Sequence, residues 1–197
     1  MPHDAFAPSD PPVSLAGEAV LLRPMRTEEL RAVVAAMIAD EVVSRVWSSD
    51  PAKLRNWLQD PDSVVFVVED PDASGEPIGV VMATSHREDP DYEAASLDIG
   101  LFEGARGRGL GPDVLRTLAR WLFGPMGFHR ITIDPAADNL AAIRAYEKAG
   151  FVRIGLARRY ERDDIGEWHD NVLLDLLPED LAGRAEPGGA SANLSSP

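Results

Sequence analysis

Cysteine is absent from this chain of 197 residues. Its absence excludes disulfides, thiolate metal ligands and cysteine nucleophiles. The four histidines, His3, His86, His129 and His169, share no metal-ligand spacing, so we expect no metal site. No run approaches the roughly 18 consecutive apolar residues of a membrane helix, and the N-terminus lacks the basic and apolar regions of a secretory signal. We therefore expect a cytoplasmic protein with no membrane partner.

Basic residues are scarce. The chain has 19 lysines and arginines against 33 aspartates and glutamates, a formal net charge of -14. This charge repels nucleic acid phosphates and attracts cations, so we expect no nucleic acid partner. A small cationic amine would suit the field as a substrate, although the simpler interpretation is acidity that only maintains solubility.

The length and the 45% share of hydrophobic residues fit one globular domain. The Pro/Asp-rich residues 1–17 and the Gly/Ser/Ala-rich residues 183–197 lack the apolar side chains that would offset the entropy of ordering them. We therefore expect a flexible N-terminal segment over 1–17, one domain over 18–182 and a disordered tail over 183–197, in a monomer or a homodimer.

Apolar periodicity and turn residues predict an order of strands and helices along the domain. Two strands, over 63–70 and 77–85, flank a turn-rich segment and are expected to form a hairpin. Later strands and helices alternate, which is typical of strand–helix–strand crossovers. We therefore expect an α/β fold on one mixed, twisted sheet. The other expected elements are strands over 19–24, 95–102, 129–134, 151–159 and 168–177, and helices beginning at Thr27 and over 53–58, 113–123 and 138–150.

The segment RGRGLG, residues 106–111, lies between an expected strand and an expected helix. A glycine-rich turn at a helix start presents unpaired N–H groups at the positive end of the helix dipole, which makes an anion site. Phosphate is the expected guest, although glycine clusters also serve only to turn the chain. The flanking sequence has to decide between these two uses.

Known phosphate-binding loops can be compared with this segment. A P-loop ends in Gly-Lys-Ser/Thr, whereas this loop ends in Gly-Pro-Asp, so nucleoside triphosphate chemistry is not expected. The dinucleotide fingerprint would place its third glycine at Pro112, which leaves a nicotinamide enzyme as the weaker alternative even though Asp134 lies at a suitable distance. The pattern Arg-x-x-Gly-x-Gly, formed by Arg106, Gly109 and Gly111, does fit.

Together with that pattern, the downstream segment TIDPAADNLAAIRAYEKAGFVRIG resembles the GCN5-related N-acetyltransferases, the GNAT family. The similarity covers most of residues 18–177 and follows the same order of loop, helix, strand, Asn–Tyr helix and Gly-Phe strand. It implies a single-domain GNAT fold with a strongly twisted mixed sheet flanked by helices, and acetyl-CoA (coenzyme A) as the cofactor. The residues that it implies for the coenzyme are Ile99, Leu101, Arg106, Gly107, Arg108, Gly109, Leu110, Gly111, Asn139, Ala142 and Tyr146.

Acetyl transfer to an amine requires a deprotonated nitrogen, stabilisation of an oxyanion and protonation of a thiolate. Asp98 is the candidate base. Strand alternation points Leu97, Ile99 and Leu101 to one face and Asp98 to the other. A structural carboxylate paired with an arginine is an equally good interpretation of Asp98. For the oxyanion we expect a backbone N–H near Leu101, where the strand splays from its neighbour.

Tyr146 is the candidate acid for the thiolate. It follows Asn139 by seven residues, so both lie near one face of a helix. Each has a structural alternative, because Tyr146 pairs with Ile143 as a core residue and Asn139 is a suitable N-cap. In the family that the chain resembles, an Asn here contacts the coenzyme and a Tyr here often protonates the thiolate.

Within the family, the Asn–Tyr segment is most similar to the aminoglycoside 6'-N-acetyltransferases. That branch implies a substrate role for Asp134, which precedes a proline, and a base role for Asp98. Trp47 would stack on a sugar ring, with a position in the core as its alternative. Asp89 and Asp91 lie in an acidic loop before the Asp98 strand and would add charge near the acceptor, unless that loop is simply solvated.

We therefore expect an acetyl-CoA-dependent N-acetyltransferase that modifies a primary amine by direct attack in a ternary complex, with an aminoglycoside antibiotic as the acceptor. The second hypothesis is transfer to a peptide lysine, an N-terminus or a polyamine, for which the sign would be an open groove in place of an acidic pocket beside Asp98. The third is a non-catalytic acyl-CoA-binding module, against which the presence of both Asp98 and Tyr146 argues.

Overall fold

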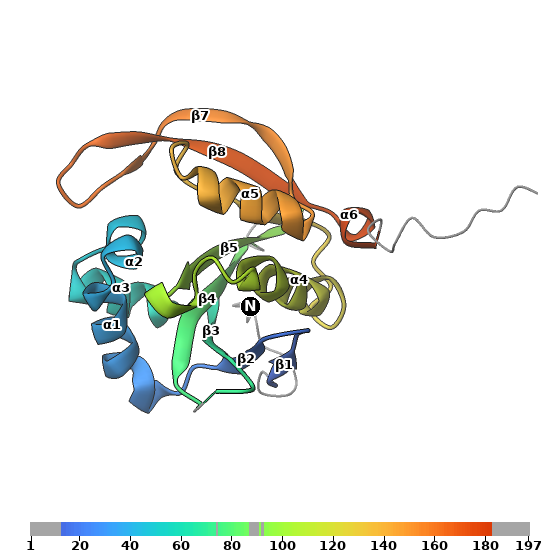
Figure 1. Ribbon diagram of the computed structural model, residues 1–197. Helices are drawn as coiled ribbons and strands as arrows, with labels where there is room; N and C mark the ends of the chain where they lie inside the picture. The colour runs from blue at the N-terminus through green and yellow to red at the C-terminus, as the bar shows by residue number, and fades with distance from the viewer. Residues whose placement is uncertain (1–12, 74, 87–90, 92, 183–197) are drawn as a thin grey trace, which may run out of the picture.

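The computed structural model describes all residues except 1–12, 74, 87–90, 92 and 183–197. The first and last of these ranges hold most of the segment expected to be flexible and all of the expected tail, so those two expectations concern residues outside the described part. The described residues form layers of helix, sheet and helix (Figure 1).

The described strands form one mixed sheet of eight strands in the order β1-β2-β3-β4-β5-β6-β8-β7. Neighbours run antiparallel, apart from the parallel pair β5 and β6. This arrangement confirms the predicted α/β class with a mixed central sheet. The strands are β1 (Leu15–Ala16), β2 (Leu21–Pro24), β3 (Ser63–Glu69), β4 (Pro77–His86), β5 (Ala94–Leu101), β6 (Ile131–Ile133), β7 (Val152–Arg162) and β8 (Trp168–Leu176).

Helices cover both faces of the sheet (Figure 1). The first three, α1 to α3, pack on one face, and α4 and α5 pack on the other. A short helix, α6, follows β8 and contacts α4. The α-helices are α1 (Leu30–Ala39), α2 (Glu41–Val46), α3 (Pro51–Leu58), α4 (Leu110–Phe123), α5 (Leu140–Ala149) and α6 (Pro178–Ala182), and the 3-10 helices are η1 (Thr27–Glu29) and η2 (Glu103–Ala105).

Two apolar clusters hold the layers together, one on each side of the sheet. Side chains of β4 alternate between them, with Val81 in the cluster under α4 and with Val80 and Met82 in the cluster under α1 to α3. Burial on both faces explains why β3 and β4 are nearly unbroken apolar runs in the sequence. On the α4 side, Phe66 and Trp121 meet edge to face with ring centroids 5.6 Å apart, an arrangement that aromatic rings prefer.

The hairpin and the end of the Asn–Tyr helix follow the prediction. β3 and β4 pair antiparallel, with Ser63 opposite Thr84. Gly150 follows α5 with a φ of 122°, a positive value that favours glycine at the end of a helix. Both features depend on local turn chemistry, which is why the sequence alone was sufficient to predict them.

Helix α2 was not predicted. Asp40 leaves the helical region, with φ at -90° and ψ at 111°, so α1 ends there. Its carboxylate accepts hydrogen bonds from Val42 N and Val43 N, each at 3.1 Å. A cap of this kind starts a new helix at once. Apolar residues lie on both sides of Asp40 in the sequence, so periodicity alone does not show where one helix ends and the next begins.

β1 also differs from the expectation, since Leu15–Ala16 falls inside the segment that we expected to be loose. The buried carboxylate of Asp113 on α4 accepts hydrogen bonds from Glu18 N at 3.1 Å and from Ala19 N at 2.8 Å. These bonds tie the turn between β1 and β2 to α4. A contact between residues so far apart in the chain leaves no mark in the local sequence pattern.

β7 and β8 form a long hairpin that extends past the rest of the sheet toward α2 (Figure 1). A register shift interrupts their ladder between Ala157 and Glu161, where residues 158–160 bulge opposite Asp170. Within the bulge, Arg159 has a φ of 51°, which is uncommon for a residue other than glycine, and its N–H donates to Asp170 Oδ1 at 2.8 Å. Such a bulge re-aims the side chains that follow it, and Glu161 is the first of these.

The fully buried Leu118 of α4 tests the larger apolar cluster. Leu118→Ala leaves a cavity beside the sheet, and we expect the free energy of unfolding to fall by about 2–5 kcal/mol in urea denaturation followed by circular dichroism. Leu140→Ala on α5 is the matched control, because that leucine is 56% exposed, and its expected change is within about 0.5 kcal/mol. Equal losses for the two variants would contradict this description of the core.

Candidate active site

The strands β5 and β6 part after two residue pairs. Their parallel ladder joins residues 95–96 to residues 131–132. Beyond these pairs β6 continues along β8, with Ile133 opposite Leu174. Within the described residues, the edge of β5 over residues 97–101 is therefore left open on this side.

Alternation along β5 decides which backbone groups face this opening. Ala95 N donates toward the β6 side at 3.1 Å, whereas Phe102 N donates to β4 at 2.9 Å. Odd-numbered N–H groups of β5 therefore face β6 and even-numbered ones face β4. The N–H groups of Ile99 and Leu101 consequently point into the opening, and these are two of the groups that the resemblance implied for the coenzyme.

The same register brings two carboxylates level with each other. Asp98 follows Ala95 by three residues, and Asp134 follows Ile131 by three, so the parallel strands carry both to one height across the opening. The side of β5 that carries Asp98 faces α2, because a Cβ built on Gly100 would lie 3.2 Å from a side chain of that helix. Asp98 thus stands on the face that strand alternation predicted.

Burial raises the pKa of Asp98 to about 7, and the nearby charges of Asp134 and Glu161 are the next causes. The side chain of Asp98 is exposed to solvent although protein atoms crowd around its carboxylate, as at the floor of a hollow. Burial also raises the pKa of Asp134. At neutral pH, Asp98 is therefore poised between its two protonation states, where a general base is most effective.

Glu161 is a third carboxylate in this hollow, and sequence reasoning missed it. The fully buried amide of Asn171 donates through Nδ2 to Glu161 Oε2 at 3.2 Å and to Asp134 O at 2.7 Å. The charge of Glu161 also acts on Asp98, which places the three carboxylates close together. No local pattern could have marked Glu161, because the bulge over residues 158–160 decides where its side chain emerges.

Asn171 has one further property. Its Oδ1 is buried and has no hydrogen-bond partner among the described residues, although buried polar atoms are normally paired. The side chain already links two members of the acidic hollow through Nδ2. A site with an unused buried acceptor beside three carboxylates is chemically suited to a ligand rich in N–H donors.

Tyr146 is buried on α5, with 8% of its surface exposed, and its ring packs against Phe151 with centroids 6.3 Å apart. Burial, followed by the charges of Asp98 and Asp134, raises the pKa of the phenol above its usual value. The phenol therefore keeps its proton at neutral pH and lies within electrostatic reach of both carboxylates. Tyr146 is thus a core residue, as its structural alternative predicts, and it also neighbours the site, while its role as the acid stays a prediction.

The glycine loop forms the start of α4. Gly107 and Gly109 have φ values of 76° and 79°, which favour glycine. A Cβ built on either would meet nothing within 4 Å, so the loop surface is open. The free N–H groups at the start of this helix of 14 residues form an anion site. The cradle therefore fits the pyrophosphate of a coenzyme.

The two arginines of the loop are held by carboxylates from elsewhere in the chain. Arg106 Nη1 donates to both carboxylate oxygens of Asp40 at 2.8 Å and to Leu101 O at 2.9 Å. Arg108 Nη2 donates to Asp70 Oδ2 at 2.7 Å. The sequence predicted both side chains as coenzyme ligands. In the structure they brace the loop, and their charge is partly compensated by these carboxylates.

Asp40 joins three parts of the site. Besides capping α2 and binding Arg106, its carboxylate accepts a hydrogen bond from Glu103 N at 2.9 Å. Burial alone would raise its pKa, but the hydrogen bonds from Arg106 and Val43 N outweigh burial, and the pKa lies below its usual value. One ionised carboxylate thus connects the corner between α1 and α2 with η2 and the coenzyme loop.

Asn139 caps α5, since its Oδ1 accepts a hydrogen bond from Ala142 N at 3.1 Å. This is the structural role that the sequence offered as its alternative, and the contacts of both residues with the coenzyme stay predictions. Leu110 is 7% exposed and packs into the α4 cluster, so its backbone faces the loop while its side chain belongs to the core. Gly111 packs near Leu101 and α5.

The predicted acceptor residues do not all meet. Trp47 is 7% exposed, and its Nε1 lies 3.4 Å from a Cβ built on Gly100. It forms a wall of the hollow and has little ring surface for stacking, which differs from the expected role and matches its core alternative. Asp91 is exposed ahead of β5 and has an interaction partner of its own. Asp89 lies outside the described residues.

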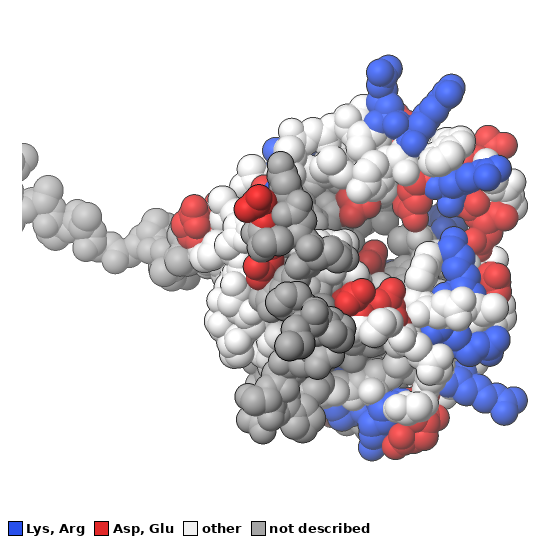
Figure 2. Space-filling view, turned by 180° about the vertical axis from the view of Figure 1, so that it is seen from behind, with Lys and Arg blue, Asp and Glu red and all other residues white. Residues whose placement is uncertain are grey.

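Figure 2 shows the molecule from behind, hollowed beside a group of acidic side chains. In the part of the chain that the structure describes, no ion pair involves Asp98, Asp134 or Glu161. Unpaired carboxylates in a hollow attract cations more strongly than carboxylates on an open surface.

No described helix has the length and apolar character of a membrane span, and the described His, Asp and Glu residues form no cluster suited to a metal ion.

An open anion cradle, a gap lined by backbone N–H groups, and an acid and a base candidate beside it match one known family. A model of the domain described as "Acetyltransferase (GNAT) domain" matches residues 19–152. The chain belongs to the GNAT family. The matched range holds the glycine loop, the Asp98 strand and the Asn139–Tyr146 helix, so it covers the residues on which the resemblance was based.

Curated GNAT relatives match a part of the chain. The aminoglycoside N(6')-acetyltransferase type 1 of Klebsiella pneumoniae is 37% identical over 91 residues, which are 42% of this chain and 45% of that protein. A kanamycin resistance protein of Rhizobium radiobacter is 41% identical over 69 residues, which are 34% of this chain and 64% of that protein. The chain thus spans less than two thirds of the length of either relative.

Solved GNAT structures match most of the chain. AAC(6')-Ib in complex with paromomycin and acetyl-CoA has a TM-score of 0.70 at 22% identity, covering 87% of this chain and 100% of that one. A spermidine N-acetyltransferase from Vibrio cholerae in complex with CoA and spermine has a TM-score of 0.69 at 20% identity, covering 83% and 98%. At this identity the likeness concerns the fold, and it confirms the predicted GNAT fold class.

Asp40→Asn tests the link between α2 and the coenzyme loop. The amide keeps the size of the side chain but loses the charge that holds Arg106, so we expect the free energy of unfolding to fall by about 1–3 kcal/mol at pH 7. The contribution of Asp40 is lost as pH falls through its lowered pKa, so the difference between the two proteins should shrink in acid.

Urea denaturation at pH 7 and at pH 3 measures both effects. Asp70→Asn is the matched control, because it removes the partner of Arg108 in an exposed ion pair, and such pairs contribute little. We expect its denaturation midpoint to stay close to that of the unaltered protein. A loss for Asp40→Asn no larger than that of the control would contradict the proposed link.

Proposed function

We propose that this GNAT protein transfers an acetyl group from acetyl-CoA to a primary amine of a small polycation, by direct attack in a ternary complex. The observation that carries the proposal is the hollow in which Asp98, Asp134 and Glu161 meet with no ion-pair partner among the described residues. An acceptor with several ammonium groups supplies those partners. An aminoglycoside antibiotic has this chemistry, which makes antibiotic resistance the proposed role.

Binding of the coenzyme is assigned to backbone groups. The N–H groups at the start of α4, around Gly109 and Gly111, would hold the pyrophosphate. The N–H groups of Ile99 and Leu101 in the opening of β5 would receive the acyl end and stabilise the developing oxyanion. When bound, the coenzyme supplies a thioester whose carbonyl carbon accepts the amine.

Asp98 and Tyr146 would supply the proton transfers. Asp98 takes a proton from the ammonium group of the acceptor, and the freed nitrogen attacks the thioester carbonyl carbon. Tyr146 would donate its phenolic proton to the thiolate that leaves as the C–S bond breaks. The proton that the new amide nitrogen loses restores the phenol, and the proton on Asp98 passes to solvent. Asp134 and Glu161 hold the other ammonium groups.

Two curated relatives, an aminoglycoside acetyltransferase and a kanamycin resistance protein, support an aminoglycoside as the acceptor. A polyamine is the second candidate. It also carries several ammonium groups for the three carboxylates, and a protein of the same fold acts on spermidine. A non-catalytic binding module is disfavoured by Asp98, whose pKa of about 7 suits proton transfer.

Release of coenzyme A from acetyl-CoA, followed with a thiol reagent, tests the proposal against three classes of amine. We expect turnover with aminoglycosides or with polyamines at a kcat/KM at least about tenfold above that for lysine peptides, since one well-placed ion pair is worth about that factor. Turnover with peptides alone would overturn the proposed acceptor class. Tight acetyl-CoA binding without turnover of any amine would favour the binding module.

The pH dependence of the reaction tests Asp98 as the base. Its carboxyl must be ionised to accept a proton, so kcat/KM should rise with pH through an apparent pKa of about 7. Asp98→Asn should remove this step and lower kcat by about 100-fold to 10,000-fold while leaving coenzyme binding intact. Glu161→Gln removes a charge that raises the pKa of Asp98, so it should move the step to lower pH. An unchanged profile in Asp98→Asn would exclude Asp98 as the base.

Tyr146→Phe tests the acid. The phenyl ring keeps the packing against Phe151, so we expect the fold and the KM for acetyl-CoA to be retained while kcat falls by about 100-fold. A substrate that releases a more acidic thiol than coenzyme A needs less help from an acid, and the variant should lose less rate with it. An equal loss with both leaving groups would argue for a purely structural role of the phenol.

A further inference from the structure

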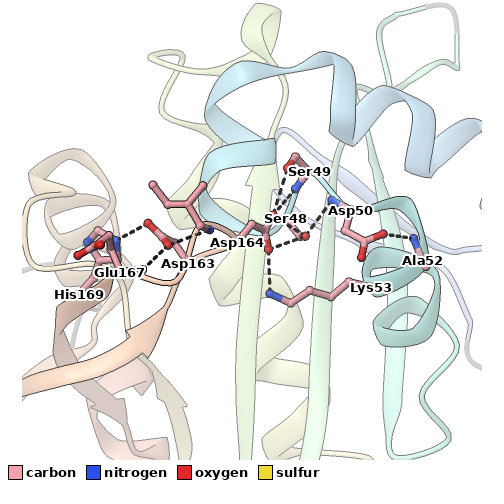
Figure 3. A network of polar contacts seen from close by, with 10 residues as sticks. Ser48, Ser49, Asp50, Ala52, Lys53, Asp163, Asp164, Glu167 and His169 are labelled. Carbon is pink, nitrogen blue, oxygen red and sulfur yellow. Dashed lines mark hydrogen bonds and ion pairs between the residues drawn. The ribbon is translucent and has the colours of Figure 1, made fainter.

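The tip of the β7–β8 hairpin touches a part of the chain more than a hundred residues away. It reaches the turn between α2 and α3 and binds it through one carboxylate, that of Asp164 (Figure 3). The turn contains Ser48 and Ser49, and Lys53 follows on α3. We call this set of contacts, formed by Asp164 with Ser48, Ser49 and Lys53, the clasp.

Asp164 accepts hydrogen bonds from both serines of the turn and forms an ion pair with Lys53. Ser48 Oγ donates to it at 2.9 Å, Ser49 N at 2.8 Å and Ser49 Oγ at 3.1 Å, and Lys53 Nζ forms an ion pair with it at 3.2 Å. Ser48 is 2% exposed, and Lys53 Nζ is held from its other side over the ring of Trp57, 4.6 Å from the centroid. Burial thus fixes Ser48, and the ring of Trp57 helps to hold Lys53.

Hydrogen bonds within the hairpin tip hold the turn that carries the Asp164 carboxylate. Neighbouring Asp163 accepts hydrogen bonds from Ile165 N at 3.1 Å and from Glu167 N at 2.8 Å through Oδ1, and its Oδ2 lies 2.9 Å from His169 Nε2 (Figure 3). These bonds close the turn of the hairpin from within. Asp164 therefore projects from a folded turn, and its bonds to the serines and the lysine join two ordered parts.

The clasp bridges the two walls of the acidic hollow. On one wall, Ser48 follows Trp47, whose indole lies over Gly100 on the Asp98 face of β5. On the other wall, Asp164 follows Glu161 by three residues. Asp98 neighbours both walls, since Trp47 lies over Gly100 and the charge of Glu161 acts on Asp98, so the bridge from Ser48 to Asp164 joins the two chain segments that flank it.

Asp164 differs in chemistry from the carboxylates inside the hollow. The backbone N–H of Ser49, followed by the hydroxyl of Ser48, lowers its pKa to about 2, and Lys53 neutralises its charge. Asp98, Asp134 and Glu161 form no ion pair among the described residues and are left for a ligand. Asp164 is therefore a positioning residue that shapes the hollow and does not bind the acceptor.

We propose that the clasp closes the outer side of the hollow and thereby selects a free, compact polycation such as an aminoglycoside over a lysine within a polypeptide. A polypeptide acceptor has to leave the site in two directions, and a bridge from wall to wall blocks one of them. A compact amine enters from one side and is enclosed. This inference rests on the proposed function and goes beyond it by naming the contacts that set the acceptor class.

Three variants of the 197-residue chain test the clasp. Asp164→Asn removes the charge and two or more of the hydrogen bonds, and Glu167→Gln, at the same hairpin tip, removes the same charge without touching the clasp. The double variant Ser48→Ala, Ser49→Ala removes the hydroxyl donors from the other side. The acceptors are an aminoglycoside and a lysine peptide, and the measured quantity is the ratio of their kcat/KM values.

We expect the ratio of aminoglycoside to peptide to fall about tenfold in Asp164→Asn and in the double serine variant, through a higher KM for the aminoglycoside and a gain with the peptide. Glu167→Gln should keep the ratio of the unaltered protein. Hydrogen exchange at Ser49 N–H, which Asp164 protects directly, should accelerate in Asp164→Asn alone of the two tip variants.

Ratios within twofold of the unaltered protein in both clasp variants, with faster exchange at Ser49, would overturn the inference, because the clasp would then be open without a change in selectivity. Absence of turnover in the unaltered protein with aminoglycosides, polyamines and lysine peptides alike would instead overturn the proposed function. In that case calorimetric binding of the same two acceptors to the coenzyme A complex replaces kcat/KM, and an unchanged binding ratio overturns the clasp.

Discussion

The parting of β5 and β6 is the constraint on which the rest of the site depends. Two paired residues hold the strands in register, and that register carries Asp98 and Asp134 to the same height on either side of the opening. The same parting frees the N–H groups of Ile99 and Leu101 from the ladder. A sheet paired along its full length would have satisfied those donors and left no room for an acyl group, so the chemistry of the site follows from an interruption of the most regular element in the fold.

Asp98, Asp134 and Glu161 lie close together in the hollow, so their negative charges repel one another. Burial and two neighbouring carboxylates raise the pKa of Asp98 to about 7, so ionising this carboxyl costs more free energy here than in water. The fold has to hold the three carboxylates together against this cost. The amide of Asn171 does so from within, and the bulge of β7 brings Glu161 to it. Such an arrangement is expected where binding of a cation, which relieves the repulsion, is the use of the site.

Much of this was open to prediction from the sequence, for physical reasons that differ from element to element. The hairpin of β3 and β4, the stop at Gly150 and the face of Asp98 follow from turn chemistry and from the twofold alternation of a strand. Helix α2 was not predicted, because apolar residues lie on both sides of its capping Asp40 and periodicity does not mark the boundary between α1 and α2. Trp47 was expected at the acceptor and lies in a wall of the hollow, since packing between α2 and β5 decides its exposure.

The loop RGRGLG shows which properties the sequence determines by itself and which only the tertiary structure decides. Its glycines determined by themselves that the chain turns with positive φ and opens a helix N-terminus to an anion, because those properties belong to the local backbone. What its arginines do was decided only by the tertiary structure, since Asp40 and Asp70 lie 66 and 38 residues away in the chain. The same holds for Glu161 beside Asp98 and for the clasp of Asp164. Ion pairs and carboxylate clusters form between distant residues, and only the packed fold fixes which charges come within reach of one another.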